Sequence, residues 1–247
     1  MAVLCASAEK ARTGNASTMG LGAAVGAVEY ALLDLVGNLR SMPVYQLAAE
    51  AAGKVVANGL RKVPAYDTSL YIDDTHLADE SEAAALIASE AMEGFARGHR
   101  AFKIKTGRGA RWMELEEGTA RDIAVIKAVR KTVGPDCPIM IDANNGYNLA
   151  ITKRVLAATR DAGIFWVEEA FHEDPVLYDD LRRWLDAEGI ECLIADGEGA
   201  AHPALVTMAI DGPLDVVQYD IFSYGFMVWP PVWPNLTVFG MVCPIDS

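Results

Sequence analysis

The sequence predicts an α/β fold built on a parallel sheet, and three observations support that prediction. Short apolar runs alternate with longer amphipathic segments from residue 100 to residue 219. Three of these runs lead to an acidic residue, namely Asp142, Glu168 and Glu198. The acids are separated by 26 and 30 residues, about the length of one strand and one helix. Because strands in such a repeat lie side by side and parallel, their carboxyl ends share one face and the carboxylates should converge.

The N-terminal region predicts helices before the sheet begins. Residues 18–37 carry small and apolar residues at helical spacing, and Gly37 is expected to end that helix. Pro43 fits the first turn of a second short helix that runs through Ala51. Residues 1–60 are therefore predicted to form a helical region of their own.

A β/α alternation follows and is predicted to occupy residues 61–220. A first strand at 63–70 precedes a helix rich in alanine and glutamate at 80–97. Further strands are predicted at 100–105, 138–142, 164–168, 191–196 and 214–219, with helices at 115–132, 149–162, 175–188 and 202–210. About six β/α strands suit either an open doubly wound sheet or an eight-stranded barrel cut short. No glycine-rich phosphate loop follows the first strand, which counts against a dinucleotide-binding fold.

The composition excludes several classes of function. The chain has 247 residues, of which 52% are hydrophobic and 22% charged, as in a globular protein with a real core. A formal net charge of -13 repels phosphate backbones, so we expect no nucleic-acid partner. The four cysteines are far apart and form no CxxC pair, which favours reduced thiols in a cytoplasmic protein. No signal peptide is evident at the N-terminus.

The segment 221–247 departs from the preceding pattern. No charged side chain occurs from Ile221 to Ile245, and four of the eleven prolines fall in the final 18 residues. The length suits a membrane span, but the proline pair at 230–231 and Pro234 would break a lone helix. We therefore predict an irregular tail and no membrane anchor, and the abrupt change suggests a truncated or frame-shifted end.

The three converging acids predict a metal site. Carboxylates brought together repel one another unless a cation lies between them, and ligands that are all oxygen favour Mg²⁺. Asn144 is expected to face the same pocket. Any one of these acids taken alone would be read as a helix N-cap or a loop charge. Glu169 and Asp196 are the competing ligands. Glu169 should point to the opposite side of its strand from Glu168, and Asp196 is a candidate supporting partner of Glu198.

Two lysines end the predicted strand at 100–105. Strand alternation places Lys103 and Lys105 on the same face. A lysine beside both a bound Mg²⁺ and a second lysine should have a lowered pKa, and it would then act as a base at neutral pH. The alternative interpretation is a pair of solvated lysines at a strand end.

Four short motifs together resemble the enolase superfamily, and most closely its mandelate racemase-like subgroup. They are Lys-Ile-Lys at 103–105, Ile-Asp-Ala-Asn at 141–144, Trp-Val-Glu-Glu at 166–169 and Ala-Asp-Gly-Glu at 195–198. Residues 23–48 also resemble the helical end of that family's N-terminal capping domain. The resemblance implies a partial (β/α)8 TIM-type barrel, preceded by the helical remnant of an α+β capping domain.

The resemblance also implies roles for individual residues. Asp142, Glu168 and Glu198 would hold Mg²⁺, and Lys105, with Lys103 beside it, would remove a proton α to a carboxylate to give an enediolate. This chemistry is that of enolase-superfamily sites in general and does not follow from the spacing alone. Asp220 at the end of the sixth strand matches an aspartate that orients a histidine on the seventh strand in the mandelate racemase-like subgroup.

The sequence also departs from the family pattern. No strand like the family's seventh or eighth follows residue 225, and the last histidine is His202. The chain thus resembles the middle of a family member, truncated at both ends, and an open barrel edge would favour a homo-oligomer. His172 follows Glu168 by four residues and is expected, with Asn144, to contact substrate.

These features favour a Mg²⁺-dependent sugar-acid dehydratase acting on a small-molecule carboxylate. Racemisation or epimerisation of a 2-hydroxy acid is the second interpretation, and it needs bases on both faces of the substrate. A catalytically inactive metal-binding fragment is a third. A Schiff-base aldolase that uses Lys105 without a metal is a fourth.

Overall fold

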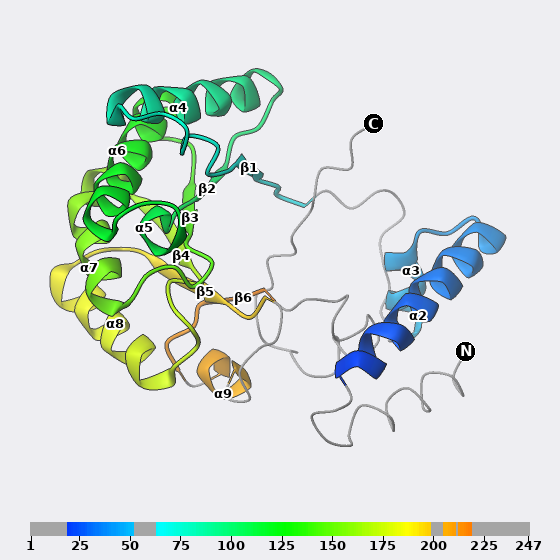
Figure 1. The fold of residues 1–247 in the computed structure, drawn as a ribbon. Coiled ribbons are helices and arrows are strands. Elements are labelled where there is room, and N and C mark those ends of the chain that lie inside the picture. Colours follow the sequence, from blue (N-terminus) through cyan, green and yellow to red (C-terminus); the bar gives the residue numbers. More distant parts are fainter. Residues whose placement is uncertain (1–18, 52–62, 199–204, 211, 219–247) are drawn as a thin grey trace. The chain divides into compact units, whose positions relative to one another are not determined.

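The computed structural model describes residues 19–51, 63–198, 205–210 and 212–218 (Figure 1). Asp220 and the predicted tail at 221–247 lie outside the described residues. The chain divides into two compact units, one that includes Met1–Val63 and one that includes Pro64–Gly197. No described helix is long and apolar enough to cross a membrane.

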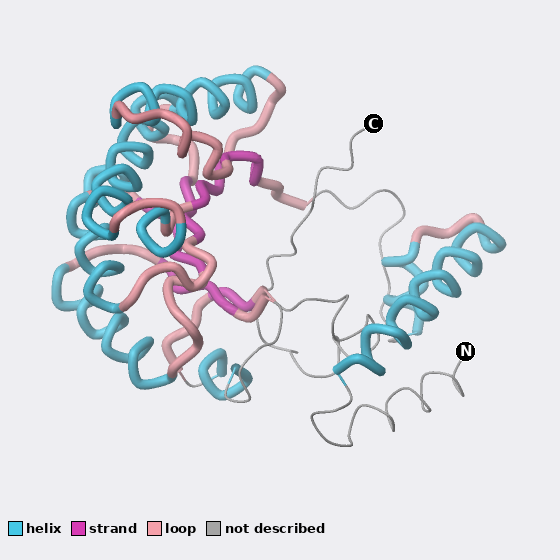
Figure 2. The backbone as a smooth tube through the Cα atoms, in the orientation of Figure 1, coloured by secondary structure: helices cyan, strands magenta, loops and turns pink. Residues whose placement is uncertain are grey.

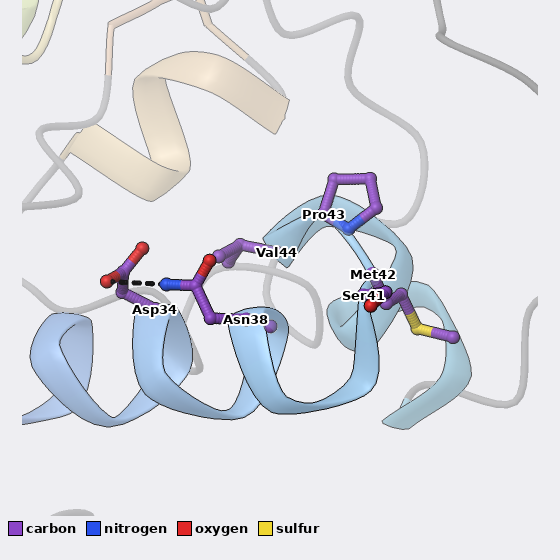
Figure 3. Close-up of a pocket in the computed structure, with 7 residues that line it drawn as sticks. Asp34, Asn38, Ser41, Met42, Pro43 and Val44 are labelled. Atoms are coloured by element: carbon purple, nitrogen blue, oxygen red, sulfur yellow. Dashed lines mark hydrogen bonds between the residues drawn. The ribbon is translucent and has the colours of Figure 1, made fainter.

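The first unit contains two helices, α2 (Met19–Arg40) and α3 (Val44–Ala51). The expected helix end at Gly37 is wrong, because α2 continues for three more residues. A Cβ at Gly37 would lie 2.8 Å from the Met42 carbonyl oxygen, so glycine here allows the following turn to pass close to the helix. Figure 3 shows this turn, with Pro43 ahead of α3 and with Asn38 Nδ2 donating to Asp34 Oδ2 at 3.1 Å.

The second unit contains one six-stranded parallel sheet. Its strands are β1 (Asp67–Leu70), β2 (Phe102–Lys105), β3 (Ile139–Asp142), β4 (Ile164–Glu168), β5 (Leu193–Asp196) and β6 (Val216–Val217). They lie side by side in the order of the sequence, β1 to β6, and every neighbouring pair is parallel. A doubly wound sheet reverses its strand order partway, so this topology excludes that alternative and is that of a partial β/α barrel.

Helices follow the strands and lie along one side of the sheet (Figure 2). They are α4 (Glu80–Ala96), α5 (Arg108–Arg111), α6 (Leu115–Val133), α7 (Leu149–Ala158), the 3₁₀ turn η2 (Arg160–Ala162), α8 (Pro175–Glu188) and α9 (Leu205–Ile210). The four-residue helix α5 was not predicted. The predicted helix at 149–162 is instead α7 followed by the separate turn η2.

Side-chain caps fix where the longer helices begin. Asp79 accepts from the backbone N–H groups of Ser81 and Glu82 ahead of α4. Asn148 and Asp174 cap α7 and α8 in the same way, since each supplies an oxygen to an otherwise unpaired backbone donor.

The two faces of the sheet differ in chemistry. Ile104, Ile141, Val167 and Ile194 occupy one level of the strand register and are completely buried. The opposite face carries an apolar cluster of Met140, Trp166, Ala195 and Val216. The polar side chains of the candidate site continue this second face at the carboxyl ends of the strands.

Candidate metal centre

The strand register brings the predicted site residues into line. Lys105 pairs with Asp142 across β2 and β3, and Asp142 pairs with Glu168 across β3 and β4. One level earlier, Lys103 pairs with Met140. Because side chains alternate along a strand, Lys103 and Lys105 project from the same face as Asp142 and Glu168.

Glu198 reaches this group by a different route. The residue of β5 at the level of Glu168 is Ala195, which carries no carboxylate. Gly197 has a φ of 111°, a left-handed conformation that ends the alternation of β5 just before Glu198. One carboxylate oxygen from each of Asp142, Glu168 and Glu198 lies within 4.8 Å of the others. Three oxygens this close suit a hard divalent cation, so the donor set fits Mg²⁺.

The two lysines contact these acids differently. Lys103 Nζ lies 2.6 Å from Glu168 Oε1 and 3.1 Å from Asp142 Oδ2, and its side chain is buried. Lys105 Nζ lies 2.5 Å from Asp142 Oδ2 and donates to Asn144 Oδ1 at 2.8 Å. The Lys105 side chain is 14% exposed against 2% for Lys103. Lys105 is therefore the lysine that an incoming molecule would meet.

Burial and repulsion change the ionisation of the acids. Burial, helped by the negative charge of Asp142, raises the pKa of Glu168 to about 7. Burial also opposes ionisation of Asp142, but Lys103 and Lys105 outweigh it and lower the pKa of that carboxyl. The two buried carboxylates thus repel each other, and a nearby cation is needed to keep both ionised, as expected of a cation site.

The pKa of Lys103 is raised, whereas the sequence predicted a lowered pKa for a lysine at this site. Burial lowers the pKa of Lys103, but attraction to Glu168 and Asp142 is stronger and the net shift is upward. The expected lowering applies to a lysine beside a bound Mg²⁺, whereas this upward shift is the effect of the two carboxylates that contact the ammonium. Lys103 therefore acts as a fixed positive charge between the acids.

Two further side chains hold Glu168, and both were missed as polar partners. Trp166 Nε1 donates to Glu168 Oε2 at 3.0 Å, and Gln218 Nε2 donates to the same oxygen at 2.9 Å. Strand alternation could have indicated Gln218. This residue lies two positions past Val216, whose side chain belongs to the apolar cluster on the same face as the site.

Asn144 links the Lys105 amine to a second glutamate. Its Nδ2 donates to Glu169 Oε2 at 2.9 Å, while its Oδ1 accepts from Lys105. Strand alternation alone would turn Glu169 away from the site. The φ of Glu169 is 42° and that of Asn144 is 43°, so both residues leave the extended conformation where their strands end. Left-handed backbone at non-glycine residues is costly and often accompanies function.

The other predicted residues are less closely tied to the centre. His172 is exposed in the loop after β4. Asp196 accepts hydrogen bonds from the Tyr178 hydroxyl of α8 and from the Gly197 N–H. Its role as a supporting partner of Glu198 stays a prediction. Burial is the main cause that raises the pKa of Asp196 to about 7.

A second buried set of charges, which the sequence did not reveal, holds the loop after β2. Arg108 donates to Asp74 at 2.6 Å and to Asp122 at 2.7 Å, and all three are completely buried. Arg108 Nη1 also donates to the Lys105 carbonyl oxygen at 3.1 Å. The Tyr147 hydroxyl donates to Asp122 at 2.8 Å. This network fixes the backbone at Lys105 to helix α6.

Comparisons with known proteins identify a family and several related enzymes. The sequence model of the enolase C-terminal domain-like family matches residues 86–227. A galacturonate dehydratase variant from Geobacillus sp., solved in complex with Mg, is 50% identical with a TM-score of 0.79. That match covers 86% of this chain and 56% of the solved chain.

Two curated relatives are more distant. Arabinonate dehydratase of Saccharolobus solfataricus is 29% identical over 82% of this chain and 48% of its own length. D-galactarolactone cycloisomerase of Agrobacterium fabrum is 36% identical over 56% of this chain and 33% of its own length. The chain thus spans half or less of the length of these two relatives.

Proposed function

This chain belongs to the enolase C-terminal domain-like family, and on that premise we propose that it removes a proton α to the carboxylate of a sugar acid in a Mg²⁺-dependent dehydration. The observation that carries the proposal is the meeting of three carboxylates within 4.8 Å beside two lysines. The named activities of the relatives, on galacturonate, arabinonate and galactarolactone, support a sugar acid as the substrate class.

In this proposal Asp142, Glu168 and Glu198 hold Mg²⁺. The solved Mg complex of the galacturonate dehydratase variant supports the choice of ion. When bound, the ion would supply Lewis-acid stabilisation of the negative charge that develops on the substrate carboxylate. That stabilisation is needed because the α-proton of a carboxylate is a very weak acid.

Lys105 is the proposed base, since it is the less buried lysine and lies at the carboxyl end of β2. Its Nζ would take the α-proton, and the C–H electron pair would move into the carboxylate to give an enediolate. That electron pair would then form the double bond to the β-carbon, and the β-hydroxyl would leave as water after it gains a proton from an acid. The resulting enol would become the keto acid. Lys103 would stay protonated between Asp142 and Glu168. Asp220, as a catalytic residue, and Asn144 and His172, as substrate contacts, remain part of the proposal.

Racemisation is the weaker candidate on the observed geometry. It requires bases on both faces of the substrate, whereas Lys103 and Lys105 project from the same face of one strand. A metal-binding chain without turnover remains the alternative of a different class, because the chain spans about half the length of its relatives. The buried free thiols Cys137 and Cys192 support a cytoplasmic location.

The proposal is tested by proton exchange. D-galacturonate and arabinonate are incubated with the protein in D₂O, with Mg²⁺ or with EDTA, and NMR follows deuterium exchange at the α-carbon of the substrate and at the former β-carbon of the keto-acid product. We expect exchange that needs Mg²⁺ and that falls at least about 100-fold in Lys105→Met, because the base is removed. Lys127→Met, at an exposed position on α6, is the matched control and should exchange like the wild type.

The outcomes separate the candidate functions. If calorimetry detects Mg²⁺ binding but neither acid exchanges its proton, the result would favour a protein that binds the metal and catalyses no reaction. Exchange that persists in EDTA would contradict the metal-dependent reaction. Trapping of substrate on Lys105 by borohydride would favour a Schiff-base aldolase instead.

A further inference from the structure

Gln218 follows directly after β6 and has no role in the proposed function. Its backbone N–H donates to the Asp196 carbonyl oxygen at 2.9 Å, which extends the parallel pairing one residue past Val217. Its side chain is partly buried, and Nε2 donates to Glu168 Oε2 at 2.9 Å. Gln218 thus reaches the candidate metal centre from a strand that contributes none of the three acids.

The two oxygens of Glu168 have different surroundings. Oε2 accepts from two neutral donors, Trp166 Nε1 at 3.0 Å and Gln218 Nε2 at 2.9 Å. Oε1 accepts from Lys103 Nζ at 2.6 Å. A carboxylate oxygen offers about two lone-pair sites, so the two N–H donors fill those of Oε2. Oε1 therefore retains room for a cation, and the donors on Oε2 determine which oxygen Glu168 presents.

The other end of the Gln218 amide is unsatisfied. Its Oε1 is buried and has no hydrogen-bond partner among the described residues. The amide orientation follows from the chemistry of a metal-holding Glu168, because such a carboxylate is ionised, accepts hydrogen bonds and must face the NH₂ group. Buried acceptors are almost always paired in folded proteins. An unpaired carbonyl oxygen beside a ligand-holding acid points to a donor that arrives with the ligand.

We propose that Gln218 is a positioning residue of this centre. Its NH₂ group holds Oε2 of Glu168, and its carbonyl oxygen accepts a hydrogen bond from an O–H group bound beside the cation. The inference rests on the proposed function, because it takes Glu168 as a metal ligand. Two sources can supply the O–H group, namely a water on the cation or a hydroxyl of a hydroxy-acid ligand.

The first test measures Mg²⁺ affinity by calorimetry together with the thermal midpoint in EDTA. Gln218→Met keeps the length of the side chain and removes both hydrogen bonds. We expect Mg²⁺ to bind about 10–100-fold more weakly, as for other residues that orient metal ligands, with the midpoint in EDTA unchanged. Gln46→Met, on α3 in the other compact unit, is the matched control and should bind Mg²⁺ as the wild type does.

Equal Mg²⁺ affinity in Gln218→Met and the wild type would overturn the inference alone, whereas a wild type that binds no Mg²⁺ would overturn the proposed function as well. A lowered midpoint in EDTA with unchanged affinity would make Gln218 a stability residue and would also overturn the inference. Gln218→Asn decides the matter if the methionine variant fails to fold. Its amide is one methylene short of Glu168, so we expect the same loss of affinity, and wild-type affinity would reject the role.

The second test identifies the O–H group at saturating Mg²⁺. Tartrate and succinate are dicarboxylates with the same carbon chain, but only tartrate carries hydroxyls. If a ligand hydroxyl meets Gln218, Gln218→Met should bind tartrate at least about tenfold more weakly and succinate equally well, as expected when a designated hydrogen bond is lost. Equal effects of the substitution on tartrate and succinate binding would assign the O–H group to a cation-bound water.

Discussion

At the residue scale, Gly197 determines whether the third acid joins the other two. Its φ of 111° is open to glycine and rarely adopted by other residues. A Cβ at this position would also lie 3.1 Å from the Leu205 side chain and 3.4 Å from that of Val217. The backbone bend and the close packing both depend on the missing side chain, and Glu198 follows immediately.

Gly197→Ala should therefore displace Glu198 as well as strain the backbone. We expect a loss of about 1–3 kcal/mol in the free energy of unfolding. We also expect Mg²⁺ affinity to fall at least about tenfold, as when a metal ligand is misplaced. Denaturant titration and calorimetry measure the two effects.

Gly163→Ala is the control, because Gly163 has a φ of 57° and open space where the Cβ would stand. It should lose stability but keep its Mg²⁺ affinity. If both variants bind Mg²⁺ like the wild type, the position of Glu198 does not depend on Gly197.

The Cys192 thiol, also at the residue scale, should make the stability of the protein depend on pH. Burial raises the pKa of the Cys192 thiol to about 12, whereas an unfolded thiol ionises near about 8.5. A raised pKa in the folded state contributes stability that is complete below about pH 8.5 and is lost as the pH rises toward 12.

Between pH 8 and pH 10 this thiol should lower the free energy of unfolding of the wild type by about 2 kcal/mol. Cys192→Ala and Cys192→Val both lack the thiol, so each should lose less stability over that range. Urea titrations at pH 7, 8, 9 and 10 make the comparison. Parallel curves for all three proteins would show that the thiol does not ionise on unfolding.

At the element scale, the Arg108 network joins the loop after β2 to helix α6 and to the segment before α4. Arg108 spans Asp74 and Asp122, and its Nη1 contacts the carbonyl oxygen of Lys105. Burial raises the pKa of Asp122, and the Arg108 guanidinium opposes that shift. The Arg108 guanidinium thus offsets part of the cost of burying the Asp122 carboxylate.

Arg108→Met should destabilise the protein by about 3–5 kcal/mol, because Asp74 and Asp122 would lose the guanidinium between them. Arg183→Met is the matched control. Arg183 is exposed and pairs with Asp180 within α8, so its loss should cost less than about 0.5 kcal/mol. Thermal unfolding followed by circular dichroism compares them, and similar losses would contradict a structural role for the buried network.

The same elements show which signals a sequence carries. The apolar runs and their spacing predicted all six strands, because buried parallel strands are nearly continuous in hydrophobic residues. The caps of α4, α7 and α8 are local motifs and lie near the predicted helix starts. The short helix α5 carries no such signal, since its position depends on Arg108 meeting acids 14 and 34 residues away.

At the scale of the whole molecule, the sequence predicted the partial barrel and the residues that meet at one end of it. Period-two alternation placed Lys103 and Lys105 correctly on one face. Alternation failed at Glu169 and Glu198, because it assumes an extended chain, whereas Glu169 and Gly197 have positive φ angles where their strands end. The hydrogen bond from Gln218 to Glu168 could not be predicted, because contacts across strands depend on the strand register.

Lys103 has a consequence for the whole chain. Its ammonium lies between Asp142 of β3 and Glu168 of β4, so three adjacent strands are joined by a charge that the polypeptide itself supplies. If Mg²⁺ binds here, a chelator should strip it while the far-ultraviolet spectrum stays constant, and later addition of the ion should restore binding without refolding. The fraction of sites that hold Mg²⁺ would then depend on the free Mg²⁺ concentration and not on whether the ion was present during folding.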